Sequence, residues 1–151
     1  DFLHRLRDSW PHKLVVKGVQ APEDAVRIKA AGADALYVSN HGARQMNAAP
    51  PAMTSIAPVR AAIGNEMPLI VDGGVRSGEH VIKAIASGAD FVMIGRSAMF
   101  GLGAAGAAGL ADILDSFARE ASSVMGLAGK TGIGDIDTSC LAVAHGYSDG
   151  N

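Results

Sequence analysis

The chain of 151 residues has the length of one ordinary domain, and 48% of its residues are hydrophobic, which favours a packed core over disorder. Its formal net charge of −2 excludes the strongly basic surface that is typical of nucleic-acid binding or a polybasic membrane anchor. The single cysteine, Cys140, excludes an internal disulfide framework and a cysteine-rich zinc site, and it favours a reducing, cytoplasmic setting.

Charged side chains interrupt every apolar stretch. Asp72, Lys83, Asp90 and Arg96 keep the apolar runs shorter than the roughly 18 residues that a membrane-spanning helix needs. The sequence therefore predicts no transmembrane segment. The chain begins with Asp1 and shows no signal-peptide pattern there, so we expect a fragment or a processed chain.

Short apolar runs alternate with helix-like segments along the chain. Consecutive apolar positions are typical of parallel strands that are buried on both faces. The predicted strands are 14–17, 35–39, 69–72 and 91–94, and the predicted helices between them are 22–31, 53–63 and 78–86. Pro22 suits the start of the first helix, and Ser77 can cap the third. Segments 31–34 and 87–90 each place a glycine after a helix and before a strand, which indicates a weak internal repeat of a βα unit.

The region after the fourth predicted strand differs in composition. Residues 101–109 are rich in Gly and Ala, which predicts a tight turn or a closely packed helix. Residues 110–125 carry apolar positions at helical spacing. We predict one structural unit over 1–137 and a mobile C-terminal tail over 138–151.

Four successive βα units fit either a small open α/β sheet or half of an eight-stranded barrel. Polar or glycine residues stand at the ends of all four predicted strands, as the working groups of (β/α)8 barrels do. These are Lys17, Ser39 with His41, Asp72 with Arg76, and Gly95 with Arg96. A complete barrel needs about 250 residues. We therefore predict an α/β fold that forms the C-terminal half of a (β/α)8 TIM barrel.

Two glycine-containing segments indicate a phosphate site. Segment 72–78 reads Asp-Gly-Gly-Val-Arg-Ser-Gly, and Gly95-Arg96 follows the next strand. Glycines allow backbone N–H groups to approach an anion, a helix N-terminus adds a favourable dipole, and arginines donate charge-assisted hydrogen bonds. Either segment alone could be a turn. Their combination predicts a phosphorylated ligand.

The segment 39–45, Ser-Asn-His-Gly-Ala-Arg-Gln, places His41 and Arg44 three residues apart at a strand end. A neutral imidazole can accept a proton at pH 7, and a guanidinium binds a carboxylate through two hydrogen bonds. This pair suggests proton abstraction from an anionic substrate.

The chain resembles the FMN-dependent α-hydroxy-acid oxidising enzymes, which include glycolate oxidase, lactate oxidase, L-lactate dehydrogenase and mandelate dehydrogenase. The resemblance runs from about Leu14 to Asp137. Its motifs, in the order and spacing of the family, are Lys17-Gly18, the segment 39–45, Asp72-Gly73-Gly74-Val75-Arg76, Gly88-Ala89, Gly95-Arg96 and the small-residue segment 101–109.

The resemblance implies a role for each matching position. His41 would be the active-site base, and Arg44 would bind the carboxylate of a 2-hydroxy acid that is oxidised to a 2-oxo acid. FMN would be bound by Lys17, Ser39, Asp72, Gly74, Arg76, Gly95 and Arg96, with Lys17 near flavin N1 and the last four residues around the phosphate. No metal is implied. The family's remaining flavin and substrate contacts, among them the aspartate that pairs with the histidine, belong to the first half of the barrel and are not found in this chain.

The implied partners are a small 2-hydroxy acid, the N-terminal half of the same barrel, and further copies of the protein in a homo-oligomer, which would be a tetramer. The location would be cytoplasmic, or peripheral to a membrane if the protein is a dehydrogenase. Asn47 stands where the family usually has Asp, which removes a charge beside Arg44. Two alternatives remain: a non-catalytic phosphate-binding half-barrel, and a phosphate-binding barrel enzyme resembling inosine-monophosphate dehydrogenase.

Overall fold

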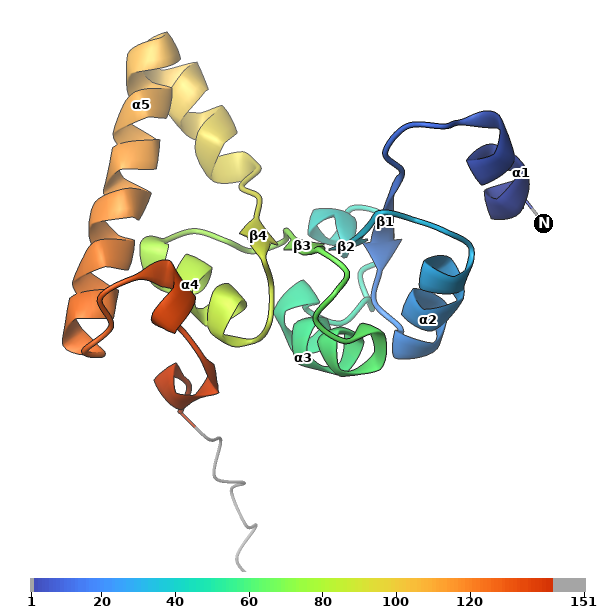
Figure 1. Cartoon of the computed structure of the whole chain (residues 1–151). Coiled ribbons are helices and arrows are strands. Elements are labelled where there is room, and N and C mark those ends of the chain that lie inside the picture. The colour runs from blue at the N-terminus through green and yellow to red at the C-terminus, as the bar shows by residue number, and fades with distance from the viewer. Residues whose placement is uncertain (1, 143–151) are drawn as a thin grey trace, which may run out of the picture.

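The structure is a computed structural model that describes residues 2–142, and its centre is a parallel sheet with the strand order β1-β2-β3-β4 (Figure 1). A helix connects each strand to the next. The strands are β1 (Val15–Val19), β2 (Ala35–Val38), β3 (Leu69–Val71) and β4 (Phe91–Val92); the α-helices are α1 (Phe2–Ser9), α2 (Pro22–Ala30), α3 (Ala52–Ile63), α4 (Gly78–Ala86) and α5 (Arg96–Leu127); the 3-10 helices are η1 (His41–Ala43), η2 (Ile133–Asp135) and η3 (Thr138–Cys140).

The helix boundary signals act as expected. Pro22 occupies the first turn of α2, and the Ser77 hydroxyl accepts a hydrogen bond from the His80 backbone N–H at the start of α4. Gly32 and Gly88 follow the last turns of α2 and α4 with φ values of 85° and 108°, a conformation that costs glycine little. The predicted βα repeat is therefore present in the backbone.

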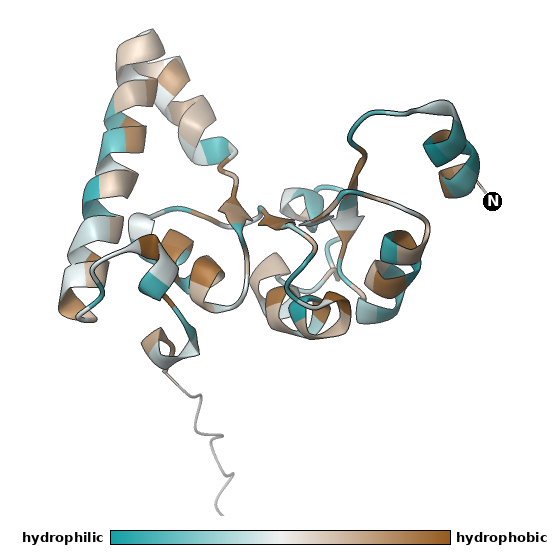
Figure 2. Cartoon of the chain, viewed as in Figure 1, coloured by the Kyte–Doolittle hydropathy of each residue, from teal (hydrophilic) through white to brown (hydrophobic). Residues whose placement is uncertain are grey.

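The core lies between the inner strands and the helices α2 and α3. Leu36, Val38, Leu69 and Val71 are fully buried there, and Ile56 of α3 packs against them. Figure 2 shows hydrophobic ribbon along β3 and β4 and on the helices beneath the sheet. These two inner strands are buried as the sequence predicted.

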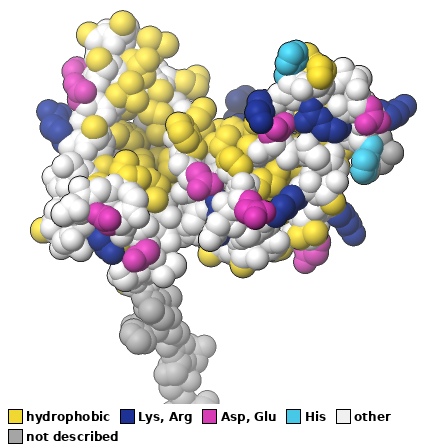
Figure 3. Space-filling model, in the orientation of Figure 1, with side chains coloured by type: hydrophobic (Ala, Val, Ile, Leu, Met, Phe, Trp, Pro, Cys, Tyr) yellow, Lys and Arg dark blue, Asp and Glu magenta, His cyan; other side chains and the backbone are white. Residues whose placement is uncertain are grey.

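The prediction of burial on both faces is wrong for the outer strands. Val15 of β1 is 45% exposed and Phe91 of β4 is 65% exposed. Both strands are edges of the sheet, and no strand within residues 2–142 pairs with their free sides. Figure 3 shows hydrophobic side chains gathered in a band from α5 to the centre of the molecule. An apolar edge strand of this kind is suited to pairing with another strand.

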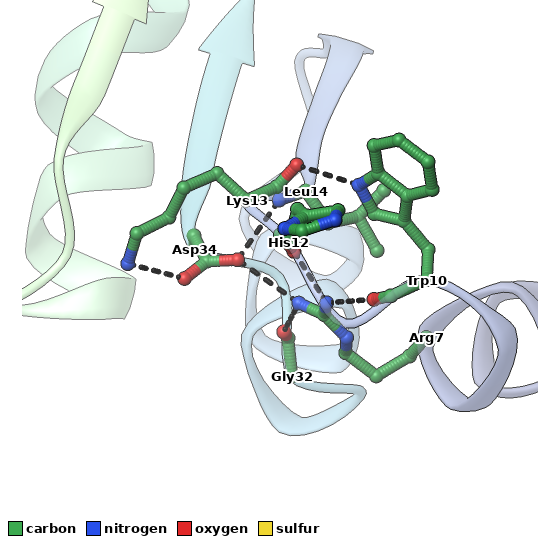
Figure 4. Close-up of polar contacts among 7 residues, drawn as sticks. All are labelled: Arg7, Trp10, His12, Lys13, Leu14, Gly32 and Asp34. Carbon is green, nitrogen blue, oxygen red and sulfur yellow. Dashed lines mark hydrogen bonds and ion pairs between the residues drawn. The ribbon is translucent and has the colours of Figure 1, made fainter.

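Helix α1 was not predicted, and the side chain of Asp34 fixes it to the sheet. Arg7 of α1 donates to an Asp34 carboxylate oxygen at 2.9 Å, Lys13 donates to the other oxygen at 2.9 Å, and the Leu14 N–H donates at 2.8 Å (Figure 4). Arg7 also donates to the carbonyl oxygens of Gly32, Trp10 and His12.

Asp90 repeats this arrangement one βαβ unit later. Its carboxylate accepts from the Leu69 N–H at 2.7 Å and from Arg60 of α3, and Arg60 also donates to the Gly88 carbonyl. In both Gly-Ala-Asp segments, the aspartate thus ties a strand start to an arginine from the preceding helix. The internal repeat therefore extends to side-chain contacts.

Helix α5 consists of two arms that meet at an angle (Figure 1). Ala105 and Gly106 leave the helical conformation, and Gly101 and Gly109 bring the arms so close that a Cβ on Gly109 would lie 2.1 Å from the Gly101 carbonyl oxygen. The second arm packs against α4, where Gly78 meets the backbone of Phe117 and Ala121. The predicted small-residue turn and amphipathic helix are therefore parts of one hairpin.

The prediction that no segment could span a membrane requires correction at α5. By length and composition, Arg96–Leu127 is apolar enough to do so. The break at Ala105 and Gly106 nevertheless divides it, and the arm before the break is too short to cross about 30 Å of hydrocarbon. The arm after the break carries Asp112, Asp115, Arg119 and Glu120.

The first part of the predicted tail is folded against the protein. Residues Thr138–Cys140 form η3, and Cys140 and Leu141 pack with Ile136 against Ile82 and Ala86 of α4. These residues therefore have a defined place in the structure, and the mobility of the tail stays a prediction. Residues 143–151 lie outside the described part of the chain, so the prediction stays untested for them.

Candidate functional site

The loops that follow β2, β3 and β4 surround a cavity of about 200 Å³ at the carboxyl ends of the strands. This volume is below the roughly 300–1,000 Å³ of most ligand pockets, as expected for a site with one wall missing. Seven of the nine predicted site residues line it: His41, Arg44, Asp72, Gly74, Arg76, Gly95 and Arg96.

The loop after β2 holds His41 in an unusual backbone conformation. His41, Gly42 and Ala43 have φ values of 53°, 64° and 60°, and His41 and Ala43 are the non-glycine residues with positive φ among those described. Such residues cost of order 1–3 kcal/mol each and cluster at functional sites. Hydrogen bonds compensate: the Gly42 N–H donates to Asn40 Oδ1 at 3.0 Å, and the His41 N–H donates to Ser39 Oγ at 3.0 Å.

Glycines in the loop after β3 serve two different purposes. A Cβ on Gly73 would lie 2.9 Å from Asn40 Oδ1, so this glycine permits close contact between the loop after β2 and the loop after β3. Gly74, with φ 78°, and Gly95 after β4 face open space instead. Backbone without side chains along a cavity wall suits a ligand that approaches closely.

Three arginines surround the same cavity from three loops. Arg44, Arg76 and Arg96 are exposed, and among residues 2–142 none of their guanidinium groups forms an ion pair. The Arg96 guanidinium also lies next to Gly42, 3.9 Å from the position of a Cβ there. Unpaired arginines around a glycine-lined cavity form an anion site.

Asp72 is the carboxylate in this site, and Lys17, Tyr37 and Ser39 already bind it. Its Oδ2 contacts Lys17 Nζ and the Tyr37 hydroxyl, each at 2.9 Å, and its Oδ1 accepts a short hydrogen bond from Ser39. Partial burial raises the pKa of Asp72, but the hydrogen bonds from Ser39, Lys17 and Tyr37 outweigh this and keep the pKa below its ordinary value. The carboxylate therefore remains charged without neutralising the arginines.

Lys17 and Ser39 are the two predicted residues that do not line the cavity. Both are bound to Asp72, which does. They therefore lie next to the cavity, with Lys17 on the edge strand β1, and the structure brings all nine predicted residues into one connected group.

The imidazole of His41 has no carboxylate partner among residues 2–142. The described residues also contain no group of three or more His, Cys, Asp or Glu side chains that could hold a metal ion. Cys140, the last residue of η3, packs against α4 and is not part of the cavity lining.

Sequence reasoning assigned no role to several residues of the site. Met93, Ser97 and Met99 line the cavity, Asn40 shapes the loop of His41, and Tyr37 binds Asp72. Tyr37 could have been found, because a tyrosine in an otherwise aliphatic strand needs a partner for its hydroxyl, and it lies on the same face as Ser39 two positions on. Nothing in the sequence singled out the two methionines.

The parallel sheet and the cavity define an α/β protein with a candidate anion site at the carboxyl ends of its strands. The family model described as FMN-dependent dehydrogenase matches residues 1–143, and the chain belongs to that family. Its N-terminal segment, which the sequence motifs did not cover, is thus included in the match.

Individual relatives agree with this assignment. The chain is 41% identical over 141 residues to an L-lactate oxidase of Lentilactobacillus hilgardii, a match that covers 93% of this chain and 38% of the relative. It is 39% identical over 142 residues to an L-lactate dehydrogenase of Pseudomonas syringae pv. syringae, covering 94% and 37%.

Solved structures agree as well. The monotopic membrane protein (S)-mandelate dehydrogenase superposes with a TM-score of 0.89 at 38% identity, over 93% of this chain and 37% of that one. A lactate oxidase of Pediococcus acidilactici gives 0.85 at 41% identity, over 89% and 38%. The chain thus spans less than two-fifths of the proteins it matches. The predicted fold, the C-terminal half of a TIM barrel, is confirmed.

Proposed function

We propose that this chain supplies the catalytic base and the FMN phosphate site of an FMN-dependent enzyme that oxidises a 2-hydroxy acid to a 2-oxo acid. The observation that carries the proposal is the arrangement of His41, Arg44, Arg76 and Arg96 around one glycine-lined cavity. Membership of the FMN-dependent dehydrogenase family supports the choice of cofactor.

Arg44 and His41 have different roles towards the substrate: Arg44 binds its carboxylate, and His41 accepts a proton from it. Arg44 has its guanidinium free of ion pairs among the described residues, and a planar guanidinium can bind both oxygens of a carboxylate. His41 lies three residues before it in the same loop, held by the hydrogen bonds from its backbone and from Gly42. With the carboxylate on Arg44, the imidazole of His41 takes up the proton that leaves the substrate during oxidation.

The wall formed by Gly74, Arg76, Gly95 and Arg96 fits the phosphate of FMN. The two glycines leave room for an anion against the backbone, and the two guanidinium groups supply charge-assisted hydrogen bonds. Asp72, Ser39 and Lys17 continue the site across the sheet towards the edge strand β1. Bound FMN would supply the two-electron acceptor, and the protein supplies binding, orientation and charge.

The other half of the barrel is the partner that this proposal requires. β1 and β4 are the edges of a sheet that closes into a barrel in the structural neighbours, and their apolar side chains are exposed. We propose that the N-terminal half of the barrel pairs with both edges and supplies a carboxylate for His41. A homo-oligomer, and a location in the cytoplasm or at a membrane surface, remain proposals from the resemblance.

The two alternative functions would require different residues or partners. A phosphate-binding barrel of the inosine-monophosphate dehydrogenase type needs a catalytic cysteine, and Cys140 packs against α4 instead. A non-catalytic half-barrel would keep the phosphate site and need no second half.

The test is to join this chain to the segment of the L. hilgardii L-lactate oxidase that precedes the matched region and to add FMN and L-lactate. This joined protein, without further substitutions, is the parent for the variants below. It should bind FMN, and the flavin absorbance should bleach when lactate is added. His41→Ala should lower turnover by about 100- to 10,000-fold, the usual contribution of a general base, and should still bind FMN. Binding without bleaching by the parent would favour the non-catalytic half-barrel.

His12→Ala is the matched control, because His12 is exposed and remote from the cavity, and its contact to Arg7 uses the backbone carbonyl. It should turn over like the parent. Normal turnover in His41→Ala would overturn the assignment of the base.

A further inference from the structure

Tyr37 lies at the centre of the group that joins Lys17 to Asp72. It sits on the inner strand β2, with Lys17 of β1 and Ile70 of β3 as its direct neighbours in the sheet. Its side chain points to the same face as Ser39, two residues later. Tyr37 therefore lies beside Lys17 and Asp72, two residues that the proposed function assigns to the flavin site.

Two separate contacts connect Tyr37 to the ion pair of Lys17 and Asp72. The hydroxyl donates to Asp72 Oδ2 at 2.9 Å, the same oxygen that lies 2.9 Å from Lys17 Nζ. The aromatic ring lies under the ammonium group, with Nζ 4.6 Å from the ring centroid. A cation over an aromatic face is attracted by the electron density of the ring. Tyr37 thus contacts both members of the pair.

These contacts hold a mobile side chain in one place. Lysine has four rotatable side-chain bonds, and the side chain of Lys17 is 48% exposed, so burial alone does not fix it. The ring limits its position on one side and the Asp72 carboxylate on the other. Ser39 completes the group by donating to Asp72 while its oxygen accepts the His41 N–H.

The Tyr37 hydroxyl remains a donor under all ordinary conditions. Burial and the negative charge of Asp72 raise the pKa of Tyr37 above its ordinary value. The hydrogen bond to Asp72 therefore persists across the pH range in which the protein would work.

We propose that Tyr37 is a positioning residue, which holds the Lys17 ammonium group and compensates the charge of Asp72, and thereby makes FMN easier to reduce. The inference rests on the proposed function, with Lys17 near flavin N1 as the family resemblance implies. A nearby cation stabilises the negative charge of the reduced flavin. Without the Tyr37 hydroxyl, Asp72 has one donor fewer and offsets more of the Lys17 charge.

Two substitutions separate the contributions of the hydroxyl and the ring. Tyr37→Phe keeps the ring beneath Lys17 and removes the hydrogen bond to Asp72, and Tyr37→Leu removes both. Leu36→Val is the matched structural control, because Leu36 is fully buried on the opposite face of the same strand.

The measurement is the reduction potential of the joined, FMN-loaded protein described above, by spectroscopic titration against a reference dye. The ratio of reduced to oxidised FMN at a fixed potential should fall about threefold in Tyr37→Phe and about tenfold in Tyr37→Leu. The larger change corresponds to a fall of about 30 mV for a two-electron couple. Leu36→Val should lower thermal stability and leave the potential unchanged.

Three outcomes would overturn the proposal. An unchanged potential in both Tyr37 variants would remove the role of Tyr37 and leave the proposed function intact. An equal shift in Leu36→Val would show that Tyr37 acts only through the stability of the strand. A joined parent protein that fails to bind FMN would overturn the proposed function, and this inference with it.

Discussion

Asp34 and Asp72 are both carboxylates bound to cations, but they lie at opposite ends of the sheet and in different surroundings. Asp34, before β2, accepts from Arg7, Lys13 and the Leu14 N–H, and both cations are thereby held in ion pairs. Asp72, after β3, accepts from Lys17, Ser39 and Tyr37, while Arg44, Arg76 and Arg96 around the same cavity remain without ion pairs among the described residues.

The amino ends of the strands, around Asp34, therefore stabilise the fold, whereas the carboxyl ends, around Asp72, form the candidate binding site. Around Asp34, every donor is used to fix α1 and the starts of strands, and Asp90 repeats the arrangement. Around Asp72, positive charge is left over and faces an open cavity. Substitutions at the Asp34 end should therefore change stability, and those at the Asp72 end should change ligand binding and turnover.

Arg44→Met should have the largest effect in this comparison. It removes the guanidinium that binds the substrate carboxylate and leaves a side chain of similar length. We expect kcat/KM for L-lactate to fall roughly 10- to 100-fold, the value of a hydrogen bond to a charged group, and the melting temperature to stay unchanged. Steady-state kinetics on the joined protein would check this.

The control for Arg44 is Arg27→Met, since Arg27 is exposed on α2 and its side chain, among residues 2–142, pairs only with Asp24, at 3.4 Å. It should leave kcat/KM unaltered. Equal losses in the two variants would mean that net charge matters and that Arg44 has no specific place in the site.

Arg96→Met should weaken FMN binding by roughly 10-fold or more, because one of two guanidinium groups leaves the phosphate cradle. The dissociation constant of the parent should also rise more steeply with salt than that of the variant. Fluorescence titration with FMN at two ionic strengths would measure both. Arg119→Met, on the exposed second arm of α5, should behave like the parent; an unaltered FMN affinity in Arg96→Met would place the phosphate elsewhere.

Asp34→Asn should have the smallest effect, confined to stability. The hydrogen bond from Lys13, with those from Leu14 and Arg7, lowers the pKa of Asp34 from 3.8 to about 2. A carboxylate with a lowered pKa in the folded state stabilises the protein above its ordinary pKa and loses this contribution as the pH falls towards the folded value. The parent should therefore melt several degrees above the variant at pH 7, and the difference should shrink between about pH 4 and pH 2.

Thermal melts from pH 2 to 7 would test this, with FMN absorbance followed at neutral pH to confirm that the site is intact. Asp24→Asn serves as the control, since Asp24 is 60% exposed and has one weak ion pair. A pH-independent gap between the parent and Asp34→Asn would contradict the assigned role of the charge.

The sequence alone was sufficient for the residues whose chemistry is local. Apolar runs located the strands, Pro22 and Ser77 marked two helix starts, and the glycines of the Gly-Ala-Asp repeat marked two helix ends. Each of these signals lies within a few residues of the feature it predicts. Polar residues after successive parallel strands must meet at one edge of a sheet, and the grouping of His41, Arg44, Asp72, Arg76 and Arg96 followed from that rule.

Tertiary structure decided the features that depend on contacts between residues far apart in sequence. The burial of β1 and β4 was wrongly predicted because an apolar run does not reveal whether a neighbouring strand is present. The hairpin of α5 depends on contact between Gly101 and Gly109, and the packing of Cys140 and Leu141 depends on α4. Tyr37 gained its place only from the strand register, which sets it beside Lys17 and within reach of Asp72, 35 residues later. Composition and spacing state which groups a chain carries, and packing decides which of them remain free to bind.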